Sequence, residues 1–175
     1  MKVIFLDIDG VVNSGDNMRC LHRLWVNHKI GPSWDQHGQL FDERCVGFLD
    51  LIIRETGAKI VISSTWRRCG LLKMKRMWDD RGLPGEVIDI TPQAACAEMV
   101  ERYYQPGADR GYEIQQWLDE HPEVEQYVIL DDDSDMLHHQ PFVKCGNHYG
   151  LTFETMKEAV EILNKPKKTD EGAVS

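Results

Sequence analysis

Short apolar runs and longer segments with helical spacing alternate along most of the chain. The runs Val3–Leu6 and Ile60–Ile62 contain no polar position, which is typical of strands buried on both faces of a parallel sheet. Runs of this kind predict strands at 2–7, 59–64, 86–90, 126–132 and 142–149. The pattern therefore predicts an α/β protein.

Apolar residues recur at helical spacing between these strands. In 43–57, Val46, Leu49 and Ile53 share one face, and Gly57 is placed to end the helix. A second helical segment, 66–81, has on its apolar side Leu71, Leu72, Met74, Met77 and Trp78. A third, 111–122, has Ile114, Trp117 and Leu118 at helical spacing. The last helix follows a cap at Thr152 or Thr155 and packs through Met156, Ala159, Val160 and Leu163. We predict a three-layer, Rossmann-like fold with a mostly parallel sheet of about five strands.

Residues 13–40 interrupt this pattern. They are rich in Gly, Asn, His and Trp and show no clean period, so we expect a small irregular insertion with one helical turn around 21–26. Residues 1–165 are predicted to form a single domain with a minimal cap. The polar segment 166–175 is predicted to be a disordered tail.

Charge narrows the choice of partners. The chain of 175 residues carries 20 Lys and Arg against 29 Asp and Glu, a net charge of −9, which argues against a broad basic surface for duplex DNA. The segment 67–81 is a local exception, with six basic and two acidic residues. Such a segment can bind phosphate groups, or it can be the solvent-exposed face of a helix.

Two further features bear on location. No apolar run approaches the ~20 residues of a membrane span, and Asp7 and Asp9 interrupt the first apolar run, unlike an export signal. The five cysteines are odd in number and form no C-x-x-C pair, which is typical of reduced thiols. We expect a cytoplasmic protein without membrane contact, and the sequence gives no oligomeric state.

Polar residues follow three of the predicted strands. They are Asp7 and Asp9 after the first strand, Ser63 and Ser64 after the second, and Asp131, Asp132 and Asp135 after the fourth. The carboxyl ends of parallel strands lie along one edge of a sheet, so these groups are expected to converge there. Asp7 and Asp9 can both face this edge while Ile8 turns towards the core.

Clustered carboxylates suggest a metal site. They raise one another's pKa unless a cation compensates, and Mg²⁺ prefers a small set of oxygen ligands. A carboxylate can also attack phosphorus, and a second one can transfer the proton. Each of these strings also has a simpler interpretation: D-x-D-G can form a turn, S-S can begin a loop, and the acidic run can be a solvated loop. Because all three follow apolar strands in this order, a functional site is favoured.

These strings resemble motifs of the haloacid dehalogenase (HAD) superfamily of phosphotransferases. D-I-D-G-V at 7–11 is similar to the first motif, which implies Asp7 as nucleophile and Asp9 as acid and base. V-I-S-S at 61–64 is similar to the second, which implies that Ser63, or else Ser64, binds the transferring phosphoryl group.

The acidic run L-D-D-D-S-D at 130–135 resembles the fourth motif of the superfamily. The resemblance implies Asp131 and Asp135 as the acidic pair, with Asp132 in a competing register because Leu130 replaces the usual glycine. It also implies that Mg²⁺ is held by Asp7, the backbone carbonyl of Asp9, and Asp131 or a neighbour.

The resemblance implies one cation beside the nucleophile. Arg110 precedes a helix and the strand that leads to the acidic run, where the superfamily often places it, and Arg67 and Arg68 are rivals just after the second motif. Arg67, Ser64 and Gly10 are also expected to contact substrate. I-S-S-T-W-R with R-G-Y-E-I-Q-Q-W-L more narrowly resembles the HAD domains associated with RNA-repair proteins.

The short insertion at 13–40 predicts an open site. An open site suits a phosphate on a nucleotide or polynucleotide end, and a phosphoprotein or a small metabolite is the alternative. Trp25, Trp34 and Trp66 can stack on bases or pack internally. We therefore predict a Mg²⁺-dependent phosphatase.

Two functions of other classes remain as alternatives. A receiver-like signalling module carries its acidic pair after the first strand and its acceptor aspartate after the third, an order that this chain does not have. A catalytically idle phosphate-binding module is disfavoured because both Asp7 and Asp9 are present. A phosphotransferase of the same superfamily stays possible.

Overall fold

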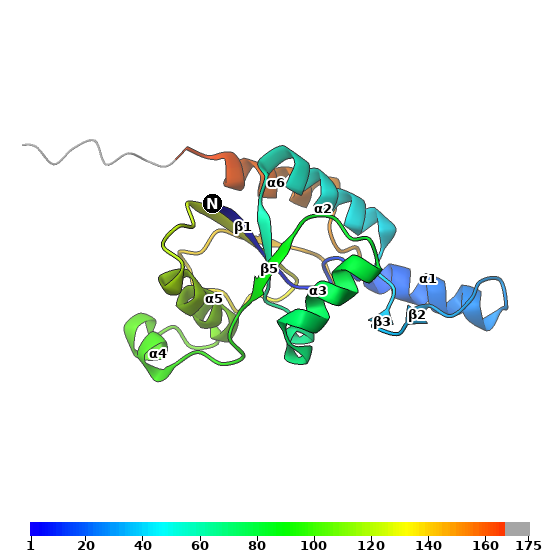
Figure 1. Ribbon diagram of the computed structural model, residues 1–175, viewed down its shortest axis with the longest axis horizontal. Helices are drawn as coiled ribbons and strands as arrows, with labels where there is room; N and C mark the ends of the chain where they lie inside the picture. Colours follow the sequence, from blue (N-terminus) through cyan, green and yellow to red (C-terminus); the bar gives the residue numbers. More distant parts are fainter. Residues whose placement is uncertain (167–175) are drawn as a thin grey trace, which may run out of the picture.

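A parallel five-stranded sheet forms the centre of the structure, a computed structural model that describes residues 1–166 (Figure 1). Its strands, in spatial order, are β5 (Val87–Ile90), β4 (Lys59–Ile62), β1 (Lys2–Leu6), β6 (Gln126–Asp131) and β7 (Phe142–Lys144). The predicted α/β fold with a parallel sheet is confirmed. Residues 167–175 of the predicted tail lie outside the described residues.

Helices cover both faces of the sheet. Side chains of α2 (Glu43–Thr56), α3 (Leu71–Asp80) and α6 (Phe153–Asn164) pack on one face, and those of α5 (Asp109–Glu120) on the other. A short helix, α4 (Ala97–Tyr103), packs beside α5 (Figure 1). Strand alternation explains this division: in β1, Ile4 and Leu6 face the first group of helices, and Val3 and Phe5 face α5.

The topology positions the site. β1 pairs with β4 on one side and with β6 on the other, so Leu6 lies beside both Ile62 and Leu130. The chain runs from β1 to β4 and β5 in one direction and returns to β6 and β7 in the other. The carboxyl ends of β1 and β6 therefore flank the switch point where α/β proteins bind ligands.

The insertion is more ordered than its sequence pattern predicted. It contains α1 (Gly15–Val26) and a two-stranded antiparallel ribbon of β2 (Trp34–Asp35) and β3 (Gly38–Gln39), so the expectation of a single helical turn is wrong. The Ser14 side chain caps α1 by accepting a hydrogen bond from the Asn17 backbone N–H at 3.2 Å. The pattern was weak because α1 buries no large apolar side chain fully.

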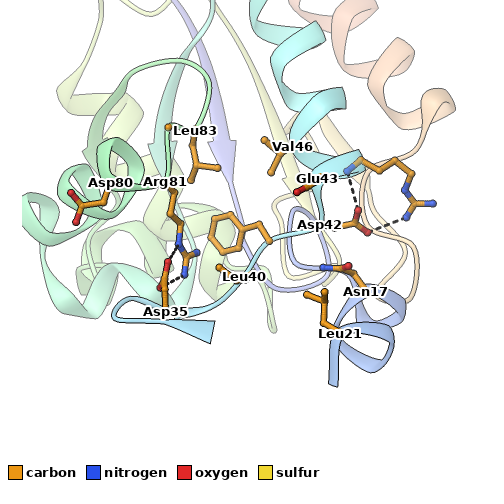
Figure 2. A pocket seen from close by; sticks show the side chains of 13 residues that line it. Asn17, Leu21, Asp35, Leu40, Asp42, Glu43, Val46, Asp80, Arg81 and Leu83 are labelled. Atoms are coloured by element: carbon orange, nitrogen blue, oxygen red, sulfur yellow. Dashed lines mark hydrogen bonds and ion pairs between the residues drawn. The ribbon is translucent and has the colours of Figure 1, made fainter. Parts of the chain in front are cut away.

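Residues 34–39, called the insertion hairpin below, are fastened to α3 and the turn that follows it. The Arg81 guanidinium donates two hydrogen bonds to the Asp35 carboxylate, at 3.0 and 2.8 Å (Figure 2), and one to the Gly38 carbonyl at 3.2 Å. His37 Nε2 lies 2.8 Å from Asp80 Oδ2. These contacts fix the hairpin although it contains only two paired positions.

The structure corrects several local predictions. Leu72, expected on the buried side of its helix, is 84% exposed, whereas Met74, Met77 and Trp78 are buried. The helix α4 was not predicted, and the segment 66–81, predicted as one helix, is divided into the short 3₁₀ helix η1 (Thr65–Cys69) and α3, with Gly70 between them. In α2 the fully buried positions are Cys45, Leu49 and Ile52, with Val46 and Ile53 at the edge of the core.

The last helix begins as expected. Thr152 is its cap, and the Thr155 hydroxyl completes a capping box by accepting from the Thr152 backbone N–H. All five cysteines are free, with Cys45 and Cys145 buried.

Within residues 1–166, none of the helices combines the length and the apolar composition that a bilayer crossing demands.

Candidate active site

Asp7 is the first residue after β1 and is held close to β6. Its backbone N–H donates to the Leu130 carbonyl at 3.0 Å, and the residue is only 6% exposed. Ile8 is fully buried in the core, as expected, whereas Asp9 is exposed. The turn after β1 thus places one carboxylate inside the site and the other at its surface.

Three carboxylates meet at the ends of β1 and β6. One carboxylate oxygen from each of Asp7, Asp131 and Asp132 lies within 4.8 Å of the other two. Gly10 allows this approach, because a Cβ at its position would lie 2.4 Å from Asp132 Cγ, and its φ of +76° also favours glycine. The geometry thus gives Gly10 a packing role, and its predicted contact with substrate stays a prediction.

Arg110 is the cation of this cluster. From the first turn of α5, its Nη1 lies 3.1 Å from Asp7 Oδ1 and its Nε lies 3.4 Å from Asp131 Oδ2. Asp135 lies further out, with Oδ2 4.0 Å from Arg110 Nε, and does not belong to the three-carboxylate cluster. Arg68 is exposed and forms no ion pair with an acidic side chain among residues 1–166.

Burial and mutual repulsion make the carboxylates weak acids. The pKa of Asp7 is raised to about 6, chiefly by burial; the Asp132 and Asp9 carboxylates add to the rise, while Arg110 and a hydrogen bond from Ser64 act in the opposite direction. Burial and the neighbouring Asp7 raise the pKa of Asp131 to about 7, against the opposing charge of Arg110. The single positive charge of Arg110 therefore does not balance the negative charge of the three carboxylates.

The cluster fits a hard divalent cation. Asp131 is 1% exposed, and its Oδ2 atom accepts no hydrogen bond from residues 1–166, although Arg110 Nε is nearby. Mg²⁺ can bind three oxygen donors, supply the positive charge that the cluster lacks and satisfy the unpaired buried oxygen. Asp7, Asp131 and Asp132 are the side chains that could hold it, and the roles predicted for Asp9 and Asp135 at the metal stay predictions.

The two serines lie at the end of β4. Ser63 is fully buried; its carbonyl accepts hydrogen bonds from Arg67 and Arg110, and its hydroxyl has no partner among residues 1–166. The Ser64 hydroxyl accepts from the Trp66 backbone N–H at 3.4 Å and caps η1. The choice between the two as phosphoryl contact stays open.

Arg67 is committed to internal contacts. Its guanidinium donates to the Ser64 carbonyl at 2.8 Å, to the Pro92 carbonyl at 3.1 Å and to Glu113 Oε2 at 2.5 Å. It is 5% exposed, so the structure shows it tying the loop after β4 to α5. Because Arg67 also lines the small cleft next to Arg110, its predicted contact with substrate stays a prediction. Glu113 had no signal in the sequence beyond a charge on a helix.

Asp9 is held from two sides. Asn13 Nδ2 donates to its Oδ1 atom and Trp66 Nε1 donates to its Oδ2 atom, both at 2.8 Å. The sequence analysis considered Trp66 for stacking or packing and did not consider Asn13. The bond from Asn13 is local to the turn after β1, whereas the bond from Trp66 has no sequence signal because it depends on how turns after different strands meet.

Two cavities lie near these groups. One of about 830 Å³ is formed by the insertion, the start of α2 and the turn after α3, and none of the carboxylates of the cluster lines it (Figure 2). A cleft of about 150 Å³ is lined by Thr65, Arg67, Arg68, Gln93, Asp109, Arg110, Glu113 and Asp135. None of the three clustered carboxylates lines this cleft either, but Arg110 does, so the smaller cleft is the one that borders the cluster.

Comparison with known proteins gives one match. The family model described as "HAD domain in Swiss Army Knife RNA repair proteins" matches residues 3–156, which include every residue of the site described above. No curated protein and no solved structure matches the chain.

The raised pKa values predict how metal-free stability depends on pH. Since the folded state binds protons more tightly at Asp7 and Asp131, their contribution to stability falls as the pH rises from about 4 to 7 and stays unfavourable above it. We expect Asp131→Asn to raise the free energy of unfolding at pH 8 in EDTA by roughly 2 kcal/mol, with a smaller gain at pH 5.

Urea unfolding of the variant, the parent protein and the exposed control Asp133→Asn at both pH values measures this difference. The control is expected to stay within about 0.5 kcal/mol of the parent. An Asp131→Asn protein less stable than the parent at pH 8 without metal would contradict the proposed repulsion.

Proposed function

The chain belongs to the family of HAD domains in Swiss Army Knife RNA repair proteins, and from this premise we propose that it is a Mg²⁺-dependent phosphomonoesterase. Membership supports a HAD-type phosphatase in general. The observation that carries the specific proposal is the ion pair of Asp7 with Arg110 inside a cluster of three carboxylates.

The first half-reaction uses Asp7 as nucleophile. An Asp7 carboxylate oxygen attacks phosphorus, the bond from phosphorus to the leaving oxygen breaks, and Asp9 donates a proton to that oxygen. Arg110 is placed to neutralise charge on both Asp7 and the transferring group, since it already lies 3.1 Å from Asp7 Oδ1. The product is an alcohol and an aspartyl-phosphate.

The second half-reaction returns the enzyme to its starting state. Asp9 removes a proton from water, the water oxygen attacks phosphorus, and the bond from phosphorus to Asp7 breaks to release inorganic phosphate. The exposed position of Asp9 suits this exchange, since the alcohol leaves and water enters on the same side. A serine hydroxyl, from Ser63 or Ser64, is proposed to bind the phosphoryl oxygens.

Mg²⁺ is proposed to be held by Asp7, Asp131 and Asp132, together with the backbone carbonyl of Asp9. When bound, the ion would neutralise the charge of the carboxylates and of the substrate phosphate. Asp135, whose Oδ2 lies 4.0 Å from Arg110 Nε, is outside this set of three carboxylates, and its predicted role at the metal stays a prediction.

A nucleotide or polynucleotide end is the proposed substrate. The family takes its description from RNA repair proteins, which supports this proposal. Of the basic segment 67–81, Arg67 and Arg81 are used in internal ion pairs, whereas Arg68 is exposed and lines the cleft beside Arg110, where it is available to phosphates. Free cysteines agree with the proposed cytoplasmic location.

Asp7→Asn should abolish hydrolysis of a generic aryl phosphate in Mg²⁺, because the amide is a poor nucleophile. Asp9→Asn should lower kcat by roughly 10²–10⁴-fold, the usual contribution of a general acid and base. Colorimetric assays with and without EDTA measure both, with Asp133→Asn as a control of unchanged activity. Equal activity of Asp7→Asn and the parent protein would exclude the aspartyl-phosphate.

Arg110→Ala should reduce kcat by about 10²-fold or more, since it removes the only side-chain cation that pairs with Asp7 in residues 1–166. Arg68→Ala, which removes an exposed arginine of the same cleft, should change kcat for a small aryl phosphate less than about 3-fold. The reverse order of effects would identify Arg68 as the motif cation instead.

A substrate panel tests the proposed substrate. Oligonucleotides with a 3′- or 5′-phosphate and free nucleotides should give kcat/KM at least about 10-fold above that of phosphopeptides and sugar phosphates. Phosphate release at equal substrate concentration measures the ranking. A preference for phosphopeptides would favour the protein-phosphatase alternative.

A further inference from the structure

Asp9 receives one hydrogen bond at each carboxylate oxygen, and the two donors come from different parts of the chain. Asn13 belongs to the same turn as Asp9, since its backbone N–H donates to the Ile8 carbonyl and its carbonyl accepts from the Gly10 N–H. Trp66 comes from η1, after β4. Within residues 1–166, Trp66 is the hydrogen-bond donor that fixes Asp9 from outside its own turn.

Trp66 is itself fixed by the insertion. The centre of its ring lies 5.6 Å from that of Phe41, in an edge-to-face arrangement. The hairpin lies close to the far end of the indole. A side chain at Gly38 would place its Cβ only 3.3 Å from Trp66 Cη2. Gly38 has a φ of +116°, which favours glycine at this contact.

Arg81 joins the two supports of Trp66. It binds the Asp35 carboxylate (Figure 2) and the Gly38 carbonyl of the hairpin, and its guanidinium lies 4.6 Å from the centre of the Phe41 ring. A continuous set of contacts therefore runs from Arg81 through the hairpin and Phe41 to Trp66, and from there to Asp9.

We propose that Trp66 is a positioning residue for Asp9, and that the insertion hairpin acts on the reaction through Trp66. The proposal rests on the proposed role of Asp9 in proton transfer. Each carboxylate oxygen has two lone pairs, so one bond from each donor leaves a position on each oxygen for the reacting proton. The indole N–H only donates, so it orients the carboxylate and cannot take the proton.

The dependence on the leaving group gives this role a signature. An alkoxide must be protonated as it leaves, whereas an acidic phenol leaves readily without a proton. Trp66→Phe keeps an aromatic ring against Phe41 and Gly38 and removes the N–H. We expect kcat/KM, which reports the first half-reaction, to fall about 10-fold for an alkyl phosphate and less than about 2-fold for an aryl phosphate of an acidic phenol.

Trp117→Phe is the matched control. Trp117 Nε1 also donates to a carboxylate at 2.8 Å, that of Asp89, but Trp117 belongs to α5 and to the core cluster on the face of the sheet opposite to the one against which Trp66 packs. The control removes the same type of bond and costs packing, so it should leave the ratio of alkyl to aryl kcat/KM unchanged. Circular dichroism at the assay temperature verifies that each variant is folded.

A double-mutant cycle tests the link to the hairpin. Asp35→Ala removes the carboxylate that binds Arg81 and should lower alkyl-phosphate kcat/KM by about 3-fold with little effect on kcat/KM of the aryl substrate. Because its effect passes through Trp66, the double variant should be no slower than Trp66→Phe alone. Multiplied effects would show that the hairpin acts by another route and would overturn that half of the proposal.

The outcomes separate this inference from the proposed function. If Asp9→Asn hydrolyses both substrates as fast as the parent protein, both fail, because Asp9 then transfers no proton. If Asp9→Asn is impaired and Trp66→Phe keeps the parental alkyl-to-aryl ratio, the proposed function holds and the positioning role is overturned. A ratio that falls only in Trp66→Phe and Asp35→Ala supports it.

Discussion

Three carboxylates forced together at the ends of two adjacent strands are the constraint on which the site depends. Parallel pairing of β1 with β6 brings Asp7 and Asp131 to the same edge, and the turn at Gly10 brings Asp132 within reach. Their repulsion is opposed by Arg110, which in turn requires α5 to begin at this edge. The remaining imbalance is what makes the cluster suitable for a divalent cation and an anionic substrate.

Asp9, the second carboxylate of the first motif, lies in an environment opposite to that of Asp7. Asp9 lies at the surface and is held by neutral N–H groups, whereas Asp7 is buried beside a guanidinium. A group that exchanges protons needs access to solvent and a fixed direction, and a nucleophile needs a compensated charge. One turn of the chain thus separates two chemically identical side chains into two environments.

Much of this arrangement could be predicted from the sequence. The strands could be recognised because they are apolar on both faces, which is typical of a parallel sheet. Since parallel strands end at one edge of the sheet, the polar residues after them, such as Asp7, Ser63 and Asp131, could be placed at that edge. The pairing of Arg110 with Asp7 could be expected only from resemblance, since it joins residues 103 apart in sequence. Leu72 was misplaced because helical spacing defines the centre of a face and not its width. The hairpin and the bond from Trp66 were beyond prediction, because Arg81 and Asp9 hold them through contacts that leave no local periodicity.

The central place of β1 in the sheet has a consequence for folding. Its hydrogen-bonding partners, β4 and β6, follow much later in the chain, and Arg110 comes between them. The residues of the acidic cluster can therefore meet only after the non-local pairing of β1 with β6 has formed, which is a slow type of contact in folding. An intermediate that contains β1, α2 and β4 would carry the proposed nucleophile without its cation or its acidic partners. The complete set of side chains at the cluster is thus also a marker that the whole sheet has assembled.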